Sequence, residues 1–110
     1  MLQFDFDNLS SKELFKDVLV RLINGEELTL NYFELMSEEV AIPFHEHPVE
    51  HLVIVLEGKV EFMFKDYHLS LDERDGLFLP ARTSHSARVI RAPVRALEIC
   101  TVAKDDYYEK

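Results

Sequence analysis

The 110-residue sequence has little cysteine, glycine or tryptophan: it contains one, three and none of them. A single cysteine, Cys100, cannot form a disulfide within the chain, which fits a reducing compartment and leads us to expect a cytoplasmic protein. The N-terminus has no basic and then apolar segment, so we expect no secretory signal. The longest strictly apolar run, residues 52–56, is far too short to span a membrane.

Positive charge is also scarce. Twelve lysines and arginines stand against 21 acidic residues, which gives a formal net charge of −9. Proteins that bind nucleic acid need clustered lysine and arginine to displace counterions. We therefore expect neither nucleic acid nor a membrane as a partner.

Short apolar runs between turn signals predict an all-β fold, a sandwich or a barrel. The pair Asn24-Gly25 is the strongest short hairpin signal, and we place further turns at Glu57-Gly58 and Ala92-Pro93. The predicted strands are 17–23, 27–36, 52–56, 59–65, 69–71, 77–79, 85–91 and 94–102.

One segment reads as a helix. Ser10 and Glu13 have the spacing of a capping box, which predicts a short helix over 11–16. The apolar residues after it fit a helical stripe as well as a strand, and the sequence alone leaves that choice open. We predict a strand over 17–23 because the hairpin signal follows it directly.

A chain of this length is near the commonest domain size, and 47% hydrophobic residues suffice for one core. We predict a single domain over 1–110. Within it, a barrel over about 17–102 lies between an N-terminal arm, 1–16, and a polar tail, 103–110.

Four histidines form a pattern typical of metal sites. His45 and His47 alternate along a strand, so their side chains share one face. Pro48 then interrupts the ladder and allows a bulge, after which His51 rejoins the same face. His85 opens another β-like run. Four imidazoles from two neighbouring strands could therefore close on one divalent ion.

The run over 51–56 is apolar on the face that alternation turns away from His51. A strand apolar on both faces must be covered on both, and so short a chain has little material for that. We therefore expect a second copy to supply the cover, as a homodimer.

This arrangement resembles the first sequence motif of the cupin family, in which His45-x-His47 is followed by a ligand at the position of His51 and by a glycine at Gly58. Asp75, followed by Pro80 and His85, resembles the second motif.

The resemblance covers residues 27–102, and cupins are double-stranded β-helix barrels that usually hold one transition metal. It therefore implies a jelly-roll barrel with a metal centre.

The chain departs from the common motif at His51, where most cupins have a glutamate ligand. It is in this respect similar to the small single-domain cupins with four histidine ligands, which hold manganese or another divalent ion. The resemblance implies one divalent transition metal (Mn, Fe, Ni, Cu or Zn) with four ligands: His45, His47, His51 and His85.

The C-terminal residues 100–107 also resemble those of the uronate ring-opening cupins, which act on unsaturated sugar acids in pectin and alginate breakdown. Those enzymes carry an acid and an arginine where this chain has Glu98 and Lys104, and a glutamine where it has His51. The resemblance implies that Glu98 moves a proton and that Lys104 holds a substrate carboxylate. Arg82, in the loop before His85, is a second candidate for binding that carboxylate.

Four neutral imidazoles leave the ion its full charge, which favours an anionic or chelating small molecule. In an octahedral ion two positions stay open, enough for a bidentate ligand or for a substrate and O₂. We expect a metal-dependent enzyme, and two chemistries remain open: oxidation of dioxygenase or oxidase type, and isomerisation or ring opening of a sugar acid. The alternative is a non-catalytic module that senses or stores a ligand with the metal as its anchor.

Overall fold

A computed structural model of the chain describes residues 1–101, and eight β-strands make up most of them. The strands are β1 (Lys12–Phe15), β2 (Val18–Asn24), β3 (Leu28–Leu35), β4 (Ala41–His45), β5 (His51–Met63), β6 (His68–Leu71), β7 (Gly76–Leu79) and β8 (His85–Thr101), preceded by one short 3₁₀ turn, η1 (Phe6–Asn8). Their pairing is antiparallel throughout. The prediction of an all-β jelly roll is confirmed.

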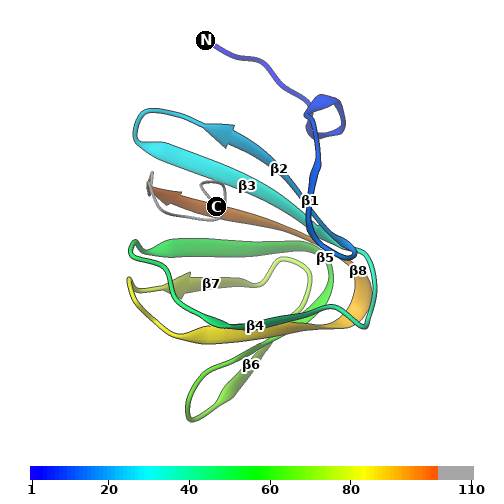
Figure 1. Cartoon of the computed structure of the whole chain (residues 1–110), viewed down its shortest axis with the longest axis vertical. Coiled ribbons are helices and arrows are strands. Elements are labelled where there is room, and N and C mark those ends of the chain that lie inside the picture. Colours follow the sequence, from blue (N-terminus) through cyan, green and yellow to red (C-terminus); the bar gives the residue numbers. More distant parts are fainter. Residues whose placement is uncertain (102–110) are drawn as a thin grey trace.

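The two long strands, β5 and β8, lie at the centre of the fold. The order of pairing is β1-β2-β3-β8-β5-β6, with β4 added to β8 and β7 added to β5. The start of β5 pairs with the end of β8, at His51 and Cys100, and its end pairs with the start of β8, at Met63 and Ser86. Figure 1 shows the result: β2 and β3 lie at the top, β4 and β6 at the bottom, and the long strands turn between them at the right.

The turns predicted at Glu57-Gly58 and Ala92-Pro93 are wrong, because both strands continue through them and bend instead. Gly58 adopts φ 83°, and a Cβ there would lie 2.7 Å from the carbonyl oxygen of Arg91 and closer still to that of Pro93. Shifts of register in this part of β5 let it turn together with β8. Glycine and proline often end a strand, but here Gly58 and Pro93 lie where β5 and β8 bend together.

The helix predicted over 11–16 is also wrong, because residues 12–15 form β1, which pairs with β2. Glu13 does not complete a capping box: its carboxylate accepts a hydrogen bond from the backbone N–H of Asp17, at 3.1 Å. Asp17, at φ 65°, then turns the chain back into β2. Strand pairing thus supplies this short segment with hydrogen bonds that a single helical turn would leave unmade.

The hairpin predicted at Asn24-Gly25 is confirmed. The backbone N–H of Gly25 donates to the carbonyl of Leu28 at 2.7 Å, and the hydroxyl of Thr29 donates to the side chain of Asn24 at 2.6 Å. From there β2 and β3 pair without a break.

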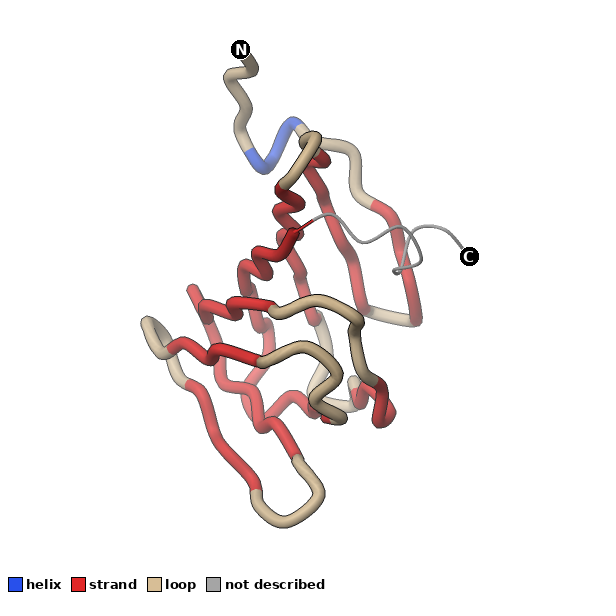
Figure 2. The backbone as a smooth tube through the Cα atoms, turned by 90° about the vertical axis from the view of Figure 1, so that its left-hand side faces the viewer, coloured by secondary structure: helices blue, strands red, loops and turns tan. Residues whose placement is uncertain are grey.

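The N-terminal arm leads away from the sheets at the top of Figure 2, and one part of it is attached to the outside of β3. The ring of Phe6 stacks on that of Tyr32, with centroids 4.4 Å apart. The guanidinium of Arg21 donates to the backbone carbonyls of Phe6 and Leu9, at 2.9 and 3.1 Å. Among the described residues, no helix is long and apolar enough to cross a membrane.

Candidate metal centre

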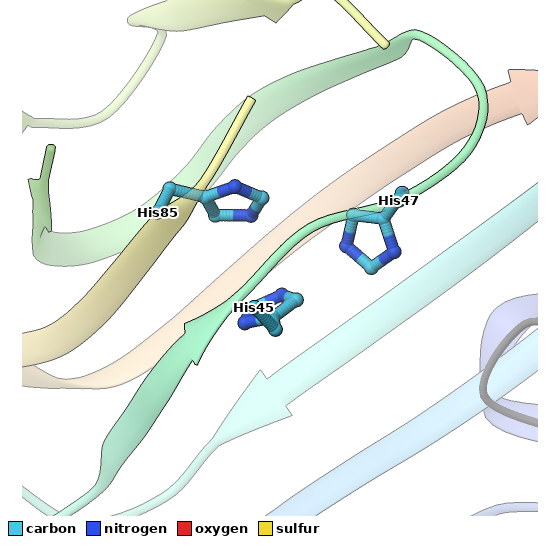
Figure 3. Close-up of side chains that lie close together, drawn as sticks. All are labelled: His45, His47 and His85. Atoms are coloured by element: carbon cyan, nitrogen blue, oxygen red, sulfur yellow. The ribbon is translucent and has the colours of Figure 1, made fainter. Parts of the chain in front are cut away.

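The four predicted histidines come together at the end of the jelly roll that lies opposite the bend. His45 is the last residue of β4 and His85 the first of β8, and these two are partners in the register of that pair. His51 is the first residue of β5. His47 lies in the loop between β4 and β5, so a loop, and not strand alternation, brings it to the site. Figure 3 shows the rings of His45, His47 and His85 close together.

Two overlapping groups of three residues lie close enough to hold a metal ion. One potential ligand atom from each of His45, His47 and His85 lies within 4.8 Å of the other two, and the same holds for His47, His51 and Glu98. The ring centroids are 4.4 Å apart for His45 and His85 and 4.3 Å apart for His47 and His51. The two groups share His47, so the five residues form one continuous set of donors.

Three of the imidazoles are oriented by the backbone. In each, Nδ1 lies within hydrogen-bond distance of the carbonyl two residues earlier in the chain. The pairs are His45 with Pro43 at 2.8 Å, His51 with Val49 at 2.8 Å and His85 with Thr83 at 2.7 Å. A carbonyl can only accept, so Nδ1 carries the proton and the lone pair is on Nε2, the tautomer that binds a metal through Nε2.

Burial keeps His85 in the neutral form. It lowers the pKa of the His85 imidazole to about 4, and the other histidines of the cluster act in the same direction, while the bond to the Thr83 carbonyl opposes the shift. At neutral pH this side chain therefore has no proton to lose before it binds a cation.

Glu98 faces the interior beside the histidines, as its alternation with Leu97 and Ile99 allows. It is buried, and its Oε1 lies 3.9 Å from Nε2 of His51. The side-chain amide of Asn31 donates to the same oxygen at 3.1 Å from the opposite register position on β3.

Asn31 is the residue of this site that sequence reasoning missed. It is a fully buried polar residue in a strand whose other residues are mostly apolar. An asparagine on the inward side of a predicted core strand was the signal available, because buried amides need partners.

The structure describes one of the two candidates for binding a substrate carboxylate. Arg82 is exposed in the loop between β7 and β8, and its backbone N–H donates to the carbonyl of His47 at 2.8 Å. That bond ties the Arg82 loop to the histidine loop. Lys104 lies outside the described residues.

The donor set fits a transition metal. Imidazole nitrogens suit Fe, Ni, Cu and Zn, and a carboxylate next to them extends the choice to Mn. A cavity of about 90 Å³ adjoins the cluster, and His45, His85 and Glu98 line part of it. An ion held here would be open to a small molecule, unlike a closed four-ligand structural zinc site.

Comparison with known proteins agrees with this fold. The sequence profile of the family described as Cupin domain matches residues 31–100. No protein of curated function matches the sequence.

Three solved structures have a similar fold. KdgF from Halomonas sp. has a TM-score of 0.83 and 14% identity over 94% of both chains. An RmlC-like cupin from Shewanella frigidimarina has a TM-score of 0.83 and 16% identity over 97% of this chain and 96% of its own. The polyketide cyclase RemF from Streptomyces resistomycificus has a TM-score of 0.80 and 20% identity over 99% and 91%. At these identities the likeness establishes the fold alone.

Proposed function

The chain belongs to the cupin family, and from this premise we propose that it is an enzyme that uses one divalent transition metal to act on a small molecule. Four side chains would hold the ion: His45, His47, His51 and His85. The observation that carries the proposal is their convergence, with the backbone orienting three of the four rings.

The bound ion supplies Lewis acidity, and redox capacity if it is manganese, iron or copper. The chain's own residues determine which ligand it accepts. Four neutral imidazoles leave the charge of the ion uncompensated, which favours an anionic or chelating head group. The Arg82 loop is bonded to the His47 carbonyl, and we propose that its guanidinium meets a carboxylate at the entrance. The corresponding role of Lys104 stays a prediction.

We propose Glu98 as the proton-transfer group. The amide of Asn31 donates to Oε1 of Glu98, and we propose that the Glu98 carboxylate takes a proton from a ligand beside the histidines and returns it at a neighbouring atom. That exchange is what isomerisation or ring opening requires. The reaction class we favour is therefore proton transfer next to a carbonyl or hydroxyl that is held at the metal centre.

Oxidation is the second candidate, and the composition of the cavity supports it. Among the described lining residues Glu98 is the one acid, and apart from His45 and His85 the remainder are apolar. Such a site offers few groups for acid–base steps but a dry place for a substrate and O₂. A non-catalytic binding module remains the alternative if no candidate substrate turns over.

The first test is the metal content of untagged protein, measured by mass spectrometry. We expect about one transition metal per chain in the wild type and a large loss in His51→Ala and in His85→Ala. His68→Ala is the matched control, because His68 is exposed on β6, and it should keep the metal. A wild type that lacks metal and refuses Mn, Fe, Ni, Cu and Zn would contradict the proposal.

Glu98→Gln separates the two chemistries, because it keeps the shape of the side chain and removes its basicity. If Glu98 transfers the proton, isomerisation or ring opening should slow by about 10²- to 10⁴-fold at unchanged metal content. Oxidation should be much less affected. A ring-opening rate equal to that of the wild type would remove Glu98 from the mechanism.

We also propose that two copies associate through the outer face of the sheet that contains β3. An apolar row crosses five strands in register: Ile23, Leu30, Ile99, Leu52 and Phe78. Residues paired in this way face the same side of a sheet. The exposed fractions of Leu52 and Phe78 are 45% and 54%. This row carries no charge in a chain of net charge −9, so two copies can meet there with the least repulsion.

Sedimentation at micromolar concentration tests the association. We expect a wild-type dimer and a monomer for Leu52→Glu. Leu69→Glu is the control, because Leu69 is an exposed leucine of β6 that lies outside the row, and it should remain dimeric. A wild type that sediments as a monomer would overturn this assignment.

A further inference from the structure

The cavity beside the histidines is mainly apolar, and from it we infer that the ligand of this site carries a compact, branched hydrocarbon body on its metal-binding head. The inference rests on the proposed function, because it takes the head to be held at the metal centre. It goes further by naming the chemical class of the remainder of the molecule.

The lining of the cavity divides by polarity. His45, His85 and Glu98 supply the polar groups. The apolar lining includes Leu14 of β1, Phe33 of β3, Ile42 of β4 and Phe62 and Val60 of β5. These residues come from four different strands, so hydrocarbon surrounds whatever extends from the histidines into the interior.

This lining is unsuited to a sugar acid. A sugar acid carries a hydroxyl on most of its carbons, and each hydroxyl buried without a hydrogen-bond partner weakens binding. Among the described residues that line the cavity, no lysine or arginine is present to pair with a buried carboxylate. A hydrocarbon body has no hydroxyls that need hydrogen-bond partners, and its transfer from water into the cavity favours binding.

Size narrows the class further. The volume of the cavity is about 90 Å³. Roughly three water molecules occupy this volume in the liquid, at about 30 Å³ each, and a cavity that accommodates benzene is larger, at ~150 Å³. An isopropyl or isobutyl group therefore suits the volume better than an aromatic ring. The class is a branched aliphatic molecule with a two-oxygen chelating head, such as a 2-oxo or 2-hydroxy acid.

The experiment is a titration of metal-loaded protein, followed by calorimetry, with four probes that share one head. Pyruvate, 3-methyl-2-oxobutyrate and 4-methyl-2-oxopentanoate lengthen the hydrocarbon body, and 2-oxoglutarate is the polar control. We expect affinity to rise about fourfold for each added carbon of the first three, which corresponds to ~0.8 kcal/mol per buried methylene. We expect 2-oxoglutarate to bind no more tightly than pyruvate.

A variant that fills the cavity sharpens the test. Ala87 is buried and lines the cavity, so Ala87→Leu should reduce the affinity for 4-methyl-2-oxopentanoate much more than the affinity for pyruvate. Ala41→Leu is the control, because Ala41 is an exposed alanine of β4 that does not line the cavity. If Ala87→Leu fails to fold, Ala96→Val, at another buried lining residue, takes its place.

The outcomes separate the inference from the proposed function. A flat series, or a preference for 2-oxoglutarate, with normal metal loading would overturn the inference and leave the metal centre in place. Failure to load any metal would overturn the proposed function. Xenon added to metal-free protein then tests whether the cavity is apolar, because an apolar cavity binds xenon. We expect the ¹²⁹Xe resonance to shift with the wild type and not with Ala87→Leu. No shift in the wild type would overturn the apolar cavity itself.

Discussion

Opposite the bend, where both ends of β8 and the start of β5 come together, the interior is lined by His51, His85 and Glu98, whereas at the bend the same two strands fill it with Val55 and Val94. All five side chains are buried. At the bend burial removes only hydrocarbon from water, which stabilises the fold. At the histidine end burial removes polar groups that bind water well, which costs stability unless an ion or partner compensates.

The comparison teaches that the two ends have different tasks. The bend holds β5 and β8 together through close contact, and the histidine end brings together groups that could hold a metal ion. Changes at the bend should therefore alter stability, and changes at the histidine end should alter metal binding and the response to pH.

The largest expected effect comes from Gly58→Ala. The new Cβ would collide with two backbone carbonyls at a residue with φ 83°, and neither carbonyl can move without breaking the corner. We expect a loss of more than ~4 kcal/mol in the free energy of unfolding, or no folded protein, by urea denaturation. Gly25→Ala is the control, because a Cβ there would come no closer than 3.2 Å to another group, the carbonyl oxygen of Leu28. Two equally mild losses would contradict the special role of the bend.

Removal of the metal is expected to act at the other end. Chelation should lower the free energy of unfolding by about 4 kcal/mol if the free metal stood at about a thousand times its Kd. Thermal unfolding with and without chelator measures the difference. In His51→Ala chelation should have little effect, and an equal drop there would show that the ion binds elsewhere.

Acid should destabilise the metal-free protein from the histidine end. The pKa of His85 is about 4 in the folded protein and near 6.5 when unfolded, so between these values the unfolded state binds more protons. Above pH 6.5 the low pKa of His85 does not reduce the free energy of unfolding. As the pH falls toward 4, the free energy of unfolding decreases by up to about 3 kcal/mol. His85→Gln should flatten this part of the profile in urea denaturation against pH. A profile that His85→Gln leaves unchanged would assign the acid sensitivity to other groups.

The smallest effect tests independence of the two ends. Val55 has no exposed surface, so Val55→Ala should cost about 2 kcal/mol of unfolding free energy through lost burial and a small cavity. Its metal content should equal that of the wild type. A Val55→Ala protein that folds but loses metal would mean that the bend also supports the site.

Much of the candidate site could be predicted from the sequence because three of its histidines are close together in the chain. His45, His47 and His51 span seven residues, and His85 follows a turn at a spacing similar to that in the related four-histidine cupins. The inward phase of His51 also followed from simple alternation. Asn31 escaped because nothing in the sequence indicates that β3 pairs with β8 and brings it opposite Glu98.

The corner of the fold escaped for a related reason. Glu57-Gly58 and Ala92-Pro93 have the composition of turns, and a local signal cannot tell a turn from a bend that is stabilised by a neighbouring strand. The same limit applies to residues 11–16: the capping-box spacing predicted a helix there, but the segment forms a strand that pairs with β2. In each case a paired strand determines the local structure. That strand is distant in the sequence or provides hydrogen bonds that local propensity does not include.

By itself, the sequence determined the all-β class, the family and the four histidines that come together, because alternation and the spacing of histidines are properties of short segments. Only the tertiary structure decided that β5 and β8 run unbroken through a shared corner, that Asn31 supports Glu98, and that hydrocarbon surrounds the space next to the histidines. Those features depend on which strands pair and which faces meet, and burial is a property of the whole fold.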